Sequence, residues 1–343
     1  MSGIADVARQ AGVSKSTASR ALSGSGYVSQ ETRDRVTRAA EMLGYVPSTN
    51  AQSLSTGRTQ NIGVVMPYVN RWFFAEVLEG IQAALLERGL DLTLYDAKPG
   101  SDTRKRIFES FLTRKRFDGL IAVGLEPEED ELDSMLALGK PVVSVVGNHE
   151  RTSVVTLDDA LTARRATEHL IELGHRRIAF LGAGSRTRWP HVESSRLDGY
   201  MQSMADAGLS EEATHTESEL TLPAGYDAAV ELLSDARTRP TAIVAACDEV
   251  AIGAIIAARR LGLHVPAALS VVGIDDHEFA EMFALTTFRQ VPREQGAAAV
   301  ELLMRQIQDP TLAPVIQRLK PRLIVRSSTG PLRSDRATAD ATV

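Results

Sequence analysis

The sequence has few of the features on which disulfide-rich, secreted or membrane proteins depend. Its 343 residues include one cysteine, Cys247, which excludes an intrachain disulfide framework and fits a reducing compartment. No apolar run approaches the roughly 20 residues that a membrane-spanning helix needs. Met1-Ser2-Gly3 leads directly into a helical pattern, without a signal peptide. We therefore expect a cytoplasmic protein without a membrane partner.

Patterns that would support metal binding or catalysis are also lacking. The seven histidines are scattered, and none belongs to a cluster with metal-ligand spacing. Gly182-Ala-Gly184 is a poor dinucleotide-binding loop, because Thr187 stands at the third glycine position. No Gly-x-Ser-x-Gly motif or phosphate loop is present. The sequence thus predicts no catalytic residues, no metal and no cofactor.

Charge is distributed unevenly along the chain. The net charge of −6 by itself argues against a nucleic-acid partner. Residues 1–60, however, hold seven Lys/Arg against four Asp/Glu, whereas residues 61–343 hold 31 against 40. A mildly basic head on an acidic body is typical of a small DNA reader joined to a larger domain.

The first 22 residues predict two short helices around a glycine corner. Gly12 supplies the positive φ that a tight corner needs, and the Ser14 hydroxyl can cap the second helix. Apolar residues recur at helical spacing and can form a shared core. The side chains left exposed on the second helix are hydroxyls and cations, which suit the DNA major groove: Lys15, Ser16, Thr17, Ser19 and Arg20.

A third helix and a hinge follow. Ser29 can cap the helix, which Gly44 ends, and the residue before Pro47 avoids the helical region. Residues 48–55 predict a short helix that is marginal when free, because so few residues carry it.

From Asn61 the chain alternates between strands and helices, which predicts parallel sheets covered on both faces. The pattern restarts once and gives two similar halves of about five strands each. Strands are expected at 62–67, 92–95, 119–123, 142–146, 178–181, 242–245, 269–273 and 322–325. Helices are expected at 75–88, 102–114, 129–138, 163–173, 196–207, 226–234, 250–261 and 294–308. Ligands of such folds bind in the cleft at the carboxyl ends of the strands.

The sequence resembles the lactose-repressor family of bacterial transcription regulators over nearly its whole length. No single motif decides this, but their order and spacing do. The motifs are Asp6-Val-Ala8, Ala11-Gly-Val-Ser14, Thr17-x-Ser-Arg20, Val28-Ser29, Gly44-Tyr-x-Pro47, Leu54, Phe73-Phe74, Asp118-Gly119-Leu120, Leu173-Gly-His175, Arg196-Leu-Asp-Gly-Tyr200, Asp248-x-x-Ala-x-Gly253, Gly273-x-Asp275 and Leu285-Thr-Thr287.

The resemblance implies an α/β chain with an N-terminal helix-turn-helix domain and a periplasmic-binding-protein-like body of two subdomains with parallel sheets. We expect a DNA-binding domain at 1–47, a hinge at 48–60, an effector-binding and dimerisation domain at 61–330, and a disordered tail at 331–343. Within the body, we expect one subdomain at 61–159 and 290–319, and the other at 160–289 and 320–330.

The resemblance also implies a homodimer that represses carbohydrate-utilisation genes from a pseudo-palindromic operator. The recognition helices, with Ser14 at their start, would enter two major grooves. The paired hinges, including Asn50, would lie in the minor groove between them. Leu54 would wedge into a base step there and kink the DNA. The energy cost of the kink would be offset by wider contact between protein and DNA. The alternative for Leu54 is a small packing contact between hinge and body.

In the cleft, the expected effector is a sugar or related metabolite. Aromatic rings stack on sugar C–H faces, so we expect Phe73 to face the ligand. The alternative is core packing of the following helix, a role expected for one of the two phenylalanines. A guanidinium can fork onto vicinal hydroxyls, and carboxylates accept from them. The predicted contacts are Phe73, Phe74, Asn148, Trp189, Arg196, Leu220, Asp248, Asp275 and Gln290. The alternatives are a surface cation for Arg196 and helix caps for the two aspartates.

Three departures from the family pattern bear on these expectations. Gly3 stands where the family has a threonine cap, so the first helix is expected to fray at its start. Cys247 replaces an asparagine before Asp248, and Asn148 lies in a Gly-Asn-His stretch where relatives carry an acidic contact. Two other functions compete with a regulator: a solute-binding sensor and a small-molecule enzyme. The head argues against the first, and the lack of a nucleophile–base pair argues against the second.

Overall fold

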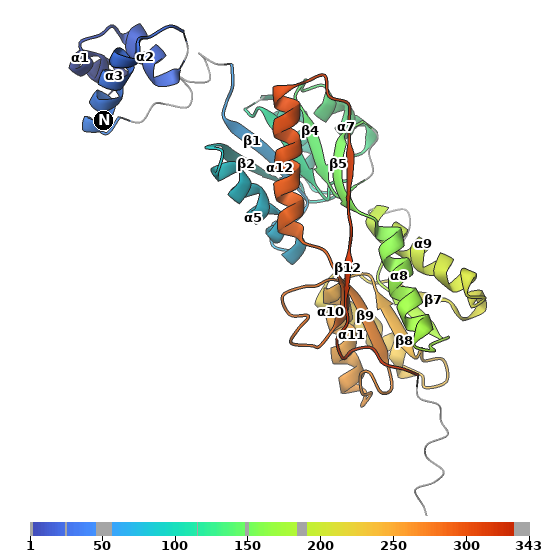
Figure 1. Ribbon diagram of the computed structural model, residues 1–343. Helices are drawn as coiled ribbons and strands as arrows, with labels where there is room; N and C mark the ends of the chain where they lie inside the picture. Colours follow the sequence, from blue (N-terminus) through green and yellow to red (C-terminus); the bar gives the residue numbers. More distant parts are fainter. Residues whose placement is uncertain are drawn as a thin grey trace, which may run out of the picture.

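The fold was analysed in a computed structural model of the chain (Figure 1). A small helical head is joined to an elongated body that contains two sheets. The structure describes residues 3–24, 26–45, 57–114, 116–147, 151–183 and 191–332.

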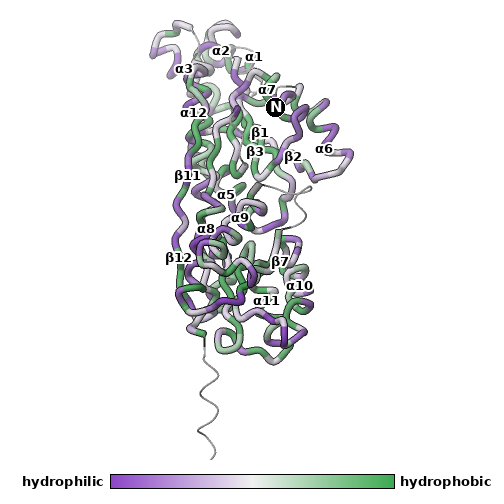
Figure 2. Tube along the Cα trace, turned by 90° about the vertical axis from the view of Figure 1, so that its right-hand side faces the viewer, coloured by the Kyte–Doolittle hydropathy of each residue, from purple (hydrophilic) through white to green (hydrophobic). Residues whose placement is uncertain are grey.

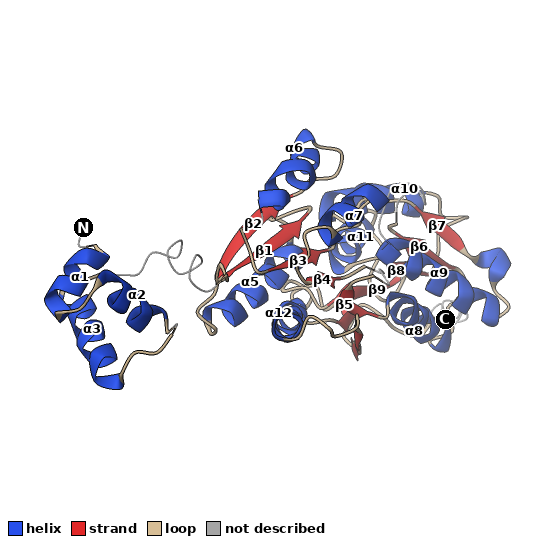
Figure 3. Ribbon diagram, turned by 90° about the horizontal axis from the view of Figure 1, so that it is seen from above, coloured by secondary structure: helices blue, strands red, loops and turns tan. Residues whose placement is uncertain are grey.

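The head is a three-helix unit, set apart from the body in Figures 1 and 3. Its helices are α1 (Ile4–Ala11), α2 (Lys15–Ser23) and α3 (Gln30–Met42). They share a core of small side chains that includes Val7 and Val36. The expected two helices around a glycine corner and the third helix are therefore present.

Local contacts define the two helix starts as the residue types suggest. Gly12 adopts a φ of 66°, and the Ser14 hydroxyl accepts from the Thr17 amide at 3.1 Å. At the start of α1 the Gly3 amide donates to the Asp6 carboxylate at 2.9 Å. The first helix was expected to fray at its start because Gly3 has no capping side chain, but Asp6 supplies a cap interaction there.

The first sheet of the body has the order β11-β5-β4-β3-β1-β2, and all its pairs are parallel. Its central strand β3 is wholly apolar and buried and appears green in Figure 2, in contrast to the charged helix α6 in purple. In sequence order the strands are β1 (Asn61–Met66), β2 (Asp91–Asp96), β3 (Gly119–Val123), β4 (Val142–Val145), β5 (Ser153–Leu157) and β11 (Ile316–Leu319).

The second sheet has the order β12-β10-β9-β8-β6-β7 and is parallel except for the β10–β12 pair. The strands are β6 (Ile178–Leu181), β7 (Thr214–Thr216), β8 (Ala242–Ala245), β9 (Ser270–Asp275), β10 (Thr286–Arg289) and β12 (Arg322–Ile324). The described residues thus hold six strands in each sheet, and the expectation of about five was too low.

Helices flank both sheets, as Figure 3 shows. The first sheet carries α5 (Trp72–Leu86), α6 (Asp102–Arg106), α7 (Glu129–Leu136) and α12 (Pro292–Gln308). The second carries α8 (Asp159–Glu172), α9 (His191–Asp206), α10 (Leu222–Ser234) and α11 (Asp248–Arg260). The single helix expected over 102–114 is instead an α-helical turn followed by a π segment, Ile107–Phe111, and a 3-10 turn, Leu112–Arg114.

The chain passes between the two sheets three times. It passes from β5 into α8, from β10 into α12, and from β11 into β12, the dark red segment of Figure 1. Residues before and after each of these passages can therefore meet between the sheets.

Glycines let α5 and α12 pack with their backbones in close contact, and this gives a first prediction. A Cβ on Gly80 would lie 2.1 Å from the Arg293 carbonyl oxygen, which belongs to backbone and cannot rotate away. We expect Gly80→Ala to lower the free energy of unfolding by about 1–3 kcal/mol, since overpacking forces the helices apart. Urea unfolding would measure this. Gln82→Ala, on an exposed position of the same helix, is the control, and equal losses in both variants would contradict the close-packing argument.

Candidate effector cavity and DNA-reading face

The outer face of α2 presents the cations and hydroxyls that the sequence predicts for DNA contact. Lys15, Ser16 and Arg20 are exposed. Thr17 and Ser19 are half-buried, and the Thr17 hydroxyl lies 2.8 Å from Ser14 Oγ within the cap. The structure thus leaves three side chains of this face open to a partner, while Ser14 and Thr17 also hold the helix start.

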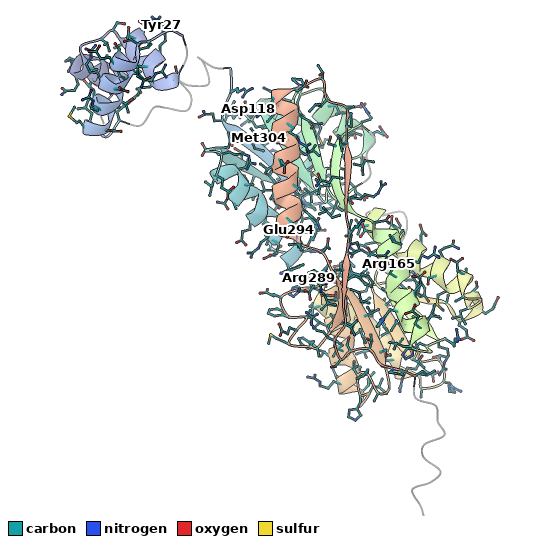
Figure 4. The ribbon with its side chains drawn as sticks, in the orientation of Figure 1. Tyr27, Asp118, Arg165, Arg289, Glu294 and Met304 are labelled. Atoms are coloured by element: carbon teal, nitrogen blue, oxygen red, sulfur yellow. The ribbon has the colours of Figure 1, made fainter. Side chains whose placement is uncertain are left out.

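The linker on the body side is tied down by a buried carboxylate. Asp118, labelled in Figure 4, precedes β3 and accepts from the amides of Thr59 and Gln60 at 2.8 and 2.9 Å. The two hinge residues predicted to touch DNA, Asn50 and Leu54, lie outside the described residues. Asp118 therefore ties residues 59 and 60 to the start of β3.

A cavity of about 840 Å³, open mouth included, lies between the two sheets. Its walls come from the ends of strands in both halves, as expected for parallel sheets. Among the predicted effector residues it brings together Phe73, Phe74, Arg196, Leu220, Asp275 and Gln290. Asn148 and Trp189 lie outside the described residues.

The apolar wall is built around two phenylalanines at the start of α5. Their rings meet edge to face with centroids 5.5 Å apart, and Tyr68 meets Phe74 in the same way at 5.8 Å. A Cβ on Gly124 would lie 2.6 Å from the Phe74 ring, so this ring packs directly on that backbone. Phe74 therefore carries packing contacts as well as lining the cavity, which leaves Phe73 as the better candidate for the ligand-facing ring.

Arg196 is a buried cation rather than a surface one, with 5% of its area exposed. Its Nε donates to Asp159 at 2.8 Å and its Nη1 to the Ala246 carbonyl at 2.5 Å. Burial raises the pKa of Asp159, although the Arg196 charge opposes that rise. These two hydrogen bonds fix the orientation of the Arg196 guanidinium, which lines the cavity from α9.

Asp275 ends β9 in a backbone conformation with a φ of 136°, which few residues other than glycine adopt. Its carboxylate lines the cavity and accepts from Gln290 Nε2 at 2.5 Å. Burial raises its pKa to about 6, against the opposing charge of Arg196. The site therefore holds a buried acceptor that titrates close to neutral pH.

Asp248 is also predicted to contact the effector, but the residues that line this cavity do not include it. It is fully buried at the start of α11, and its carboxylate accepts from Thr287 Oγ1 at 2.6 Å and from the His277 amide at 2.9 Å. Burial and the neighbouring Asp275 charge raise its pKa to about 8. Its carboxyl group therefore joins the start of α11 to β10 and to the segment after β9.

Several charged residues on the walls were missed from the sequence. Asp159 follows β5, a strand that the sequence analysis did not recognise; had it been recognised, the strand-end rule would have included this residue. Glu193 lies on α9, three residues before Arg196, and Glu249 lies on α11, next to Asp248. Arg71 lines the mouth with its guanidinium 3.9 Å from the centroid of the Tyr68 ring, and only the folded chain reveals that stacking.

Neither metal nor membrane binding gains support from the described part of the chain. Its residues contain no group of three or more His, Cys, Asp or Glu arranged to hold a metal ion. None of its helices is both long and apolar enough to cross a membrane.

Comparisons with known proteins agree with this arrangement. Residues 3–48 match the bacterial regulatory proteins described as the lacI family, and residues 167–329 match a periplasmic binding protein-like domain. The regulator DegA of Bacillus subtilis is 34% identical over 349 residues, covering 96% of this chain and 99% of DegA. The chain belongs to the lacI family. Members of this family are DNA-binding transcriptional regulators rather than enzymes, so the head is a DNA-binding domain.

Solved structures of lacI-family proteins share the same architecture. A lac repressor dimer bound to operator and an anti-inducer has a TM-score of 0.84 and 27% identity, covering 96% of this chain and 99% of the repressor chain. A complex of the regulator CelR with cellobiose has a TM-score of 0.68 and 32% identity, covering 96% of this chain and all of that one. The expected helix-turn-helix head and two-sheet body of the lacI fold are thereby confirmed.

Proposed function

We propose that this transcriptional regulator is a homodimeric repressor of carbohydrate-utilisation genes, with a sugar as the effector in the cavity between its sheets. One observation carries the proposal: the cavity combines an aromatic wall with a fixed Arg196–Asp159 pair and the Asp275 acceptor. Aromatic rings cover the C–H faces of a sugar, and the charged groups satisfy its hydroxyls. The CelR relative binds cellobiose, and another solved relative, from Enterococcus faecium, holds ribose.

On the DNA side, Lys15, Ser16 and Arg20 are assigned to the operator major groove, with Ser14, Thr17 and Ser19 supporting them. Asn50 and Leu54 are assigned to the minor groove between two paired heads. The protein acts in the bacterial cytoplasm and joins the nucleoid when it binds operator. The head carries little net charge, so a dimeric body that spaces two heads supplies the affinity that one head lacks.

Coupling between the two sites follows from the three passages of the chain between the sheets. A ligand that contacts Phe73 in one half and Asp275 in the other changes how the halves lie against each other. The Asp118 anchor passes that change to the linker, and hence to the hinge. Ligand and operator then compete or cooperate through the spacing of the heads.

The test combines ligand and DNA binding on the full chain. Cellobiose and ribose are titrated while thermal melting is followed, since a ligand at 100 times its Kd stabilises the folded state by about 2.7 kcal/mol. Genomic fragments retained by the protein are then sequenced and competed with the stabilising sugar. A pseudo-palindromic motif whose binding changes with sugar is expected. Sugar binding without a preferred DNA sequence would instead indicate a solute sensor, and turnover of the sugar an enzyme.

Asp275→Asn is the matched variant for this test, and its effect depends on pH. We expect sugar stabilisation to be lost, because the amide no longer offers a charged acceptor. Folded Asp275 has a pKa of about 6 against 3.8 for an unperturbed aspartate, so the folded state binds more protons between those values and its stability falls as pH rises through them. At pH 7 the variant should therefore be more stable by about 1–3 kcal/mol without ligand. A less stable variant at pH 7 would contradict the buried charge.

A further inference from the structure

Gln295 is an amide side chain with no exposed surface, on the second turn of α12. Its Nε2 donates to Gln290 Oε1 at 2.8 Å, whereas its own Oε1 has no hydrogen-bond partner. Such an unsatisfied buried oxygen costs stability, and a leucine of similar size would avoid that cost. The hydrogen bond to Gln290 is therefore the one favourable polar contact that the Gln295 amide makes.

That hydrogen bond determines which way the Gln290 amide faces. Because Gln290 Oε1 accepts from Gln295, the Nε2 of Gln290 is left to donate to Asp275 Oδ1. In the opposite orientation Gln290 would turn its oxygen toward the carboxylate and its NH2 toward the Gln295 NH2, so that both contacts would be repulsive. The three side chains form one directed chain from the buried face of α12 to the cavity.

We propose that Gln295 is a positioning residue for the effector, holding the Asp275 carboxylate in place through the amide of Gln290. The inference rests on the proposed function, since it takes the cavity to be the effector site. Gln290 lies where the chain passes from β10 into α12, and α12 packs closely against α5. Asp275 in one half is thus oriented by a helix that packs in the other.

The titratable groups around Asp275 come from three further helices. They are Arg196 on α9, Asp159 on α8, and Asp248 and Glu249 at the start of α11. Burial raises the pKa of Asp275, while Arg196 and the Gln290 hydrogen bond both lower it. When the Gln290 amide is free to turn, the pKa of Asp275 rises and the carboxylate is charged only at higher pH.

The experiment measures cellobiose affinity by calorimetry between about pH 5 and 8 on full-length wild type, Gln295→Leu and Gln295→Glu. Gln295→Leu removes the donor, and the carboxylate of Gln295→Glu favours the turned Gln290 amide. In both variants we expect about a tenfold loss of cellobiose affinity at pH 7. We also expect the midpoint, the pH at which the affinity change is half complete, to shift upward by about one unit. Wild-type affinity and midpoint, or a loss of affinity that is uniform across pH, would overturn the proposal.

Gln306→Leu is the matched control, because Gln306 lies on the same helix and also has a buried Oε1 without a partner. Its Nε2 donates to Ser153 Oγ at 2.8 Å, and it lines a different cavity beside Lys140 and Pro310. We expect this variant to keep the wild-type affinity and midpoint. A midpoint shift in Gln306→Leu equal to that in Gln295→Leu would show a general effect of α12 and overturn the proposal.

A ligand-free measurement separates this proposal from the proposed function. If cellobiose does not bind wild type, the sugar assignment fails for that ligand, but the melting profile against pH still reports on Asp275. The stability decline that ends near pH 6 in wild type should extend to higher pH in Gln295→Leu, and Asp275→Asn should remove it from both backgrounds. Identical profiles for wild type and Gln295→Leu would overturn the positioning role.

Discussion

Arg196→Leu is expected to abolish sugar binding and to destabilise the protein by about 3–5 kcal/mol, the usual cost of leaving a buried charge without its partner. The guanidinium and the Asp159 carboxylate are each less than a tenth exposed, and they meet at 2.8 Å. Removing the cation leaves Asp159 to be protonated or to remain as an unpaired charge. Chemical unfolding and a sugar titration at pH 7 would measure both effects.

Two features of the Arg196→Leu experiment separate stability from ligand contact. Because protonation neutralises Asp159, the variant should lose less stability at acidic pH than at neutral pH. The double variant Arg196→Leu with Asp159→Leu should recover much of the stability, since no buried charge is left, yet still fail to bind sugar. A double variant that binds sugar would remove Arg196 from the ligand site.

Arg20→Ala is expected to reduce specific operator binding by a factor of about 30 to 20,000. A base-reading contact contributes about 1–3 kcal/mol, and a homodimer loses it once in each half-site. Arg20 is exposed on α2, and its Nε donates to the Ser16 carbonyl at 3.2 Å, which leaves the end of the guanidinium available. Fluorescence anisotropy with the operator selected above would measure the loss.

Arg38→Ala is the matched control for Arg20→Ala. Arg38 is also exposed, and its Nε donates in the same way to a carbonyl four residues earlier, that of Asp34, but it lies on α3. Both variants remove one positive charge, so a general electrostatic effect would lower the operator affinity of both equally. A loss confined to Arg20→Ala that persists at higher salt is expected. Equal losses would show that α2 is not the reading helix.

The elements that could be recognised from the sequence differ from those that were missed mainly in length and in the regularity of their apolar pattern. Long apolar or periodic segments, such as β3 and α12, were found close to their actual bounds, because apolar residues recur in them with a clear periodicity. The strands β5, β7, β10 and β11 were missed. Three of them are short and partly polar, and β7 and β11 lie beside a single neighbour or near an edge, where burial imposes little pattern.

The candidate site was recovered to the extent that strand ends and family motifs could locate it. Phe73, Arg196 and Asp275 line the cavity, whereas Asp248, for which the sequence predicts the same role, accepts hydrogen bonds from Thr287 and His277 instead of lining it. Residue type and position after a strand are the same for Asp248 and Asp275. Only the direction of the side chain distinguishes them, and this depends on packing between segments distant in sequence.

The sequence by itself determined the kind of protein: its helix-turn-helix signature, its repeated strand–helix alternation and its charge division follow from local spacing and composition. The tertiary structure alone decided how the site operates. Pairing of Arg196 with Asp159 joins residues 37 positions apart, and the Gln295–Gln290–Asp275 chain joins two halves of the body. Hydrogen bonds of this kind depend on distance and direction in space, and periodicity along the chain carries no information about either.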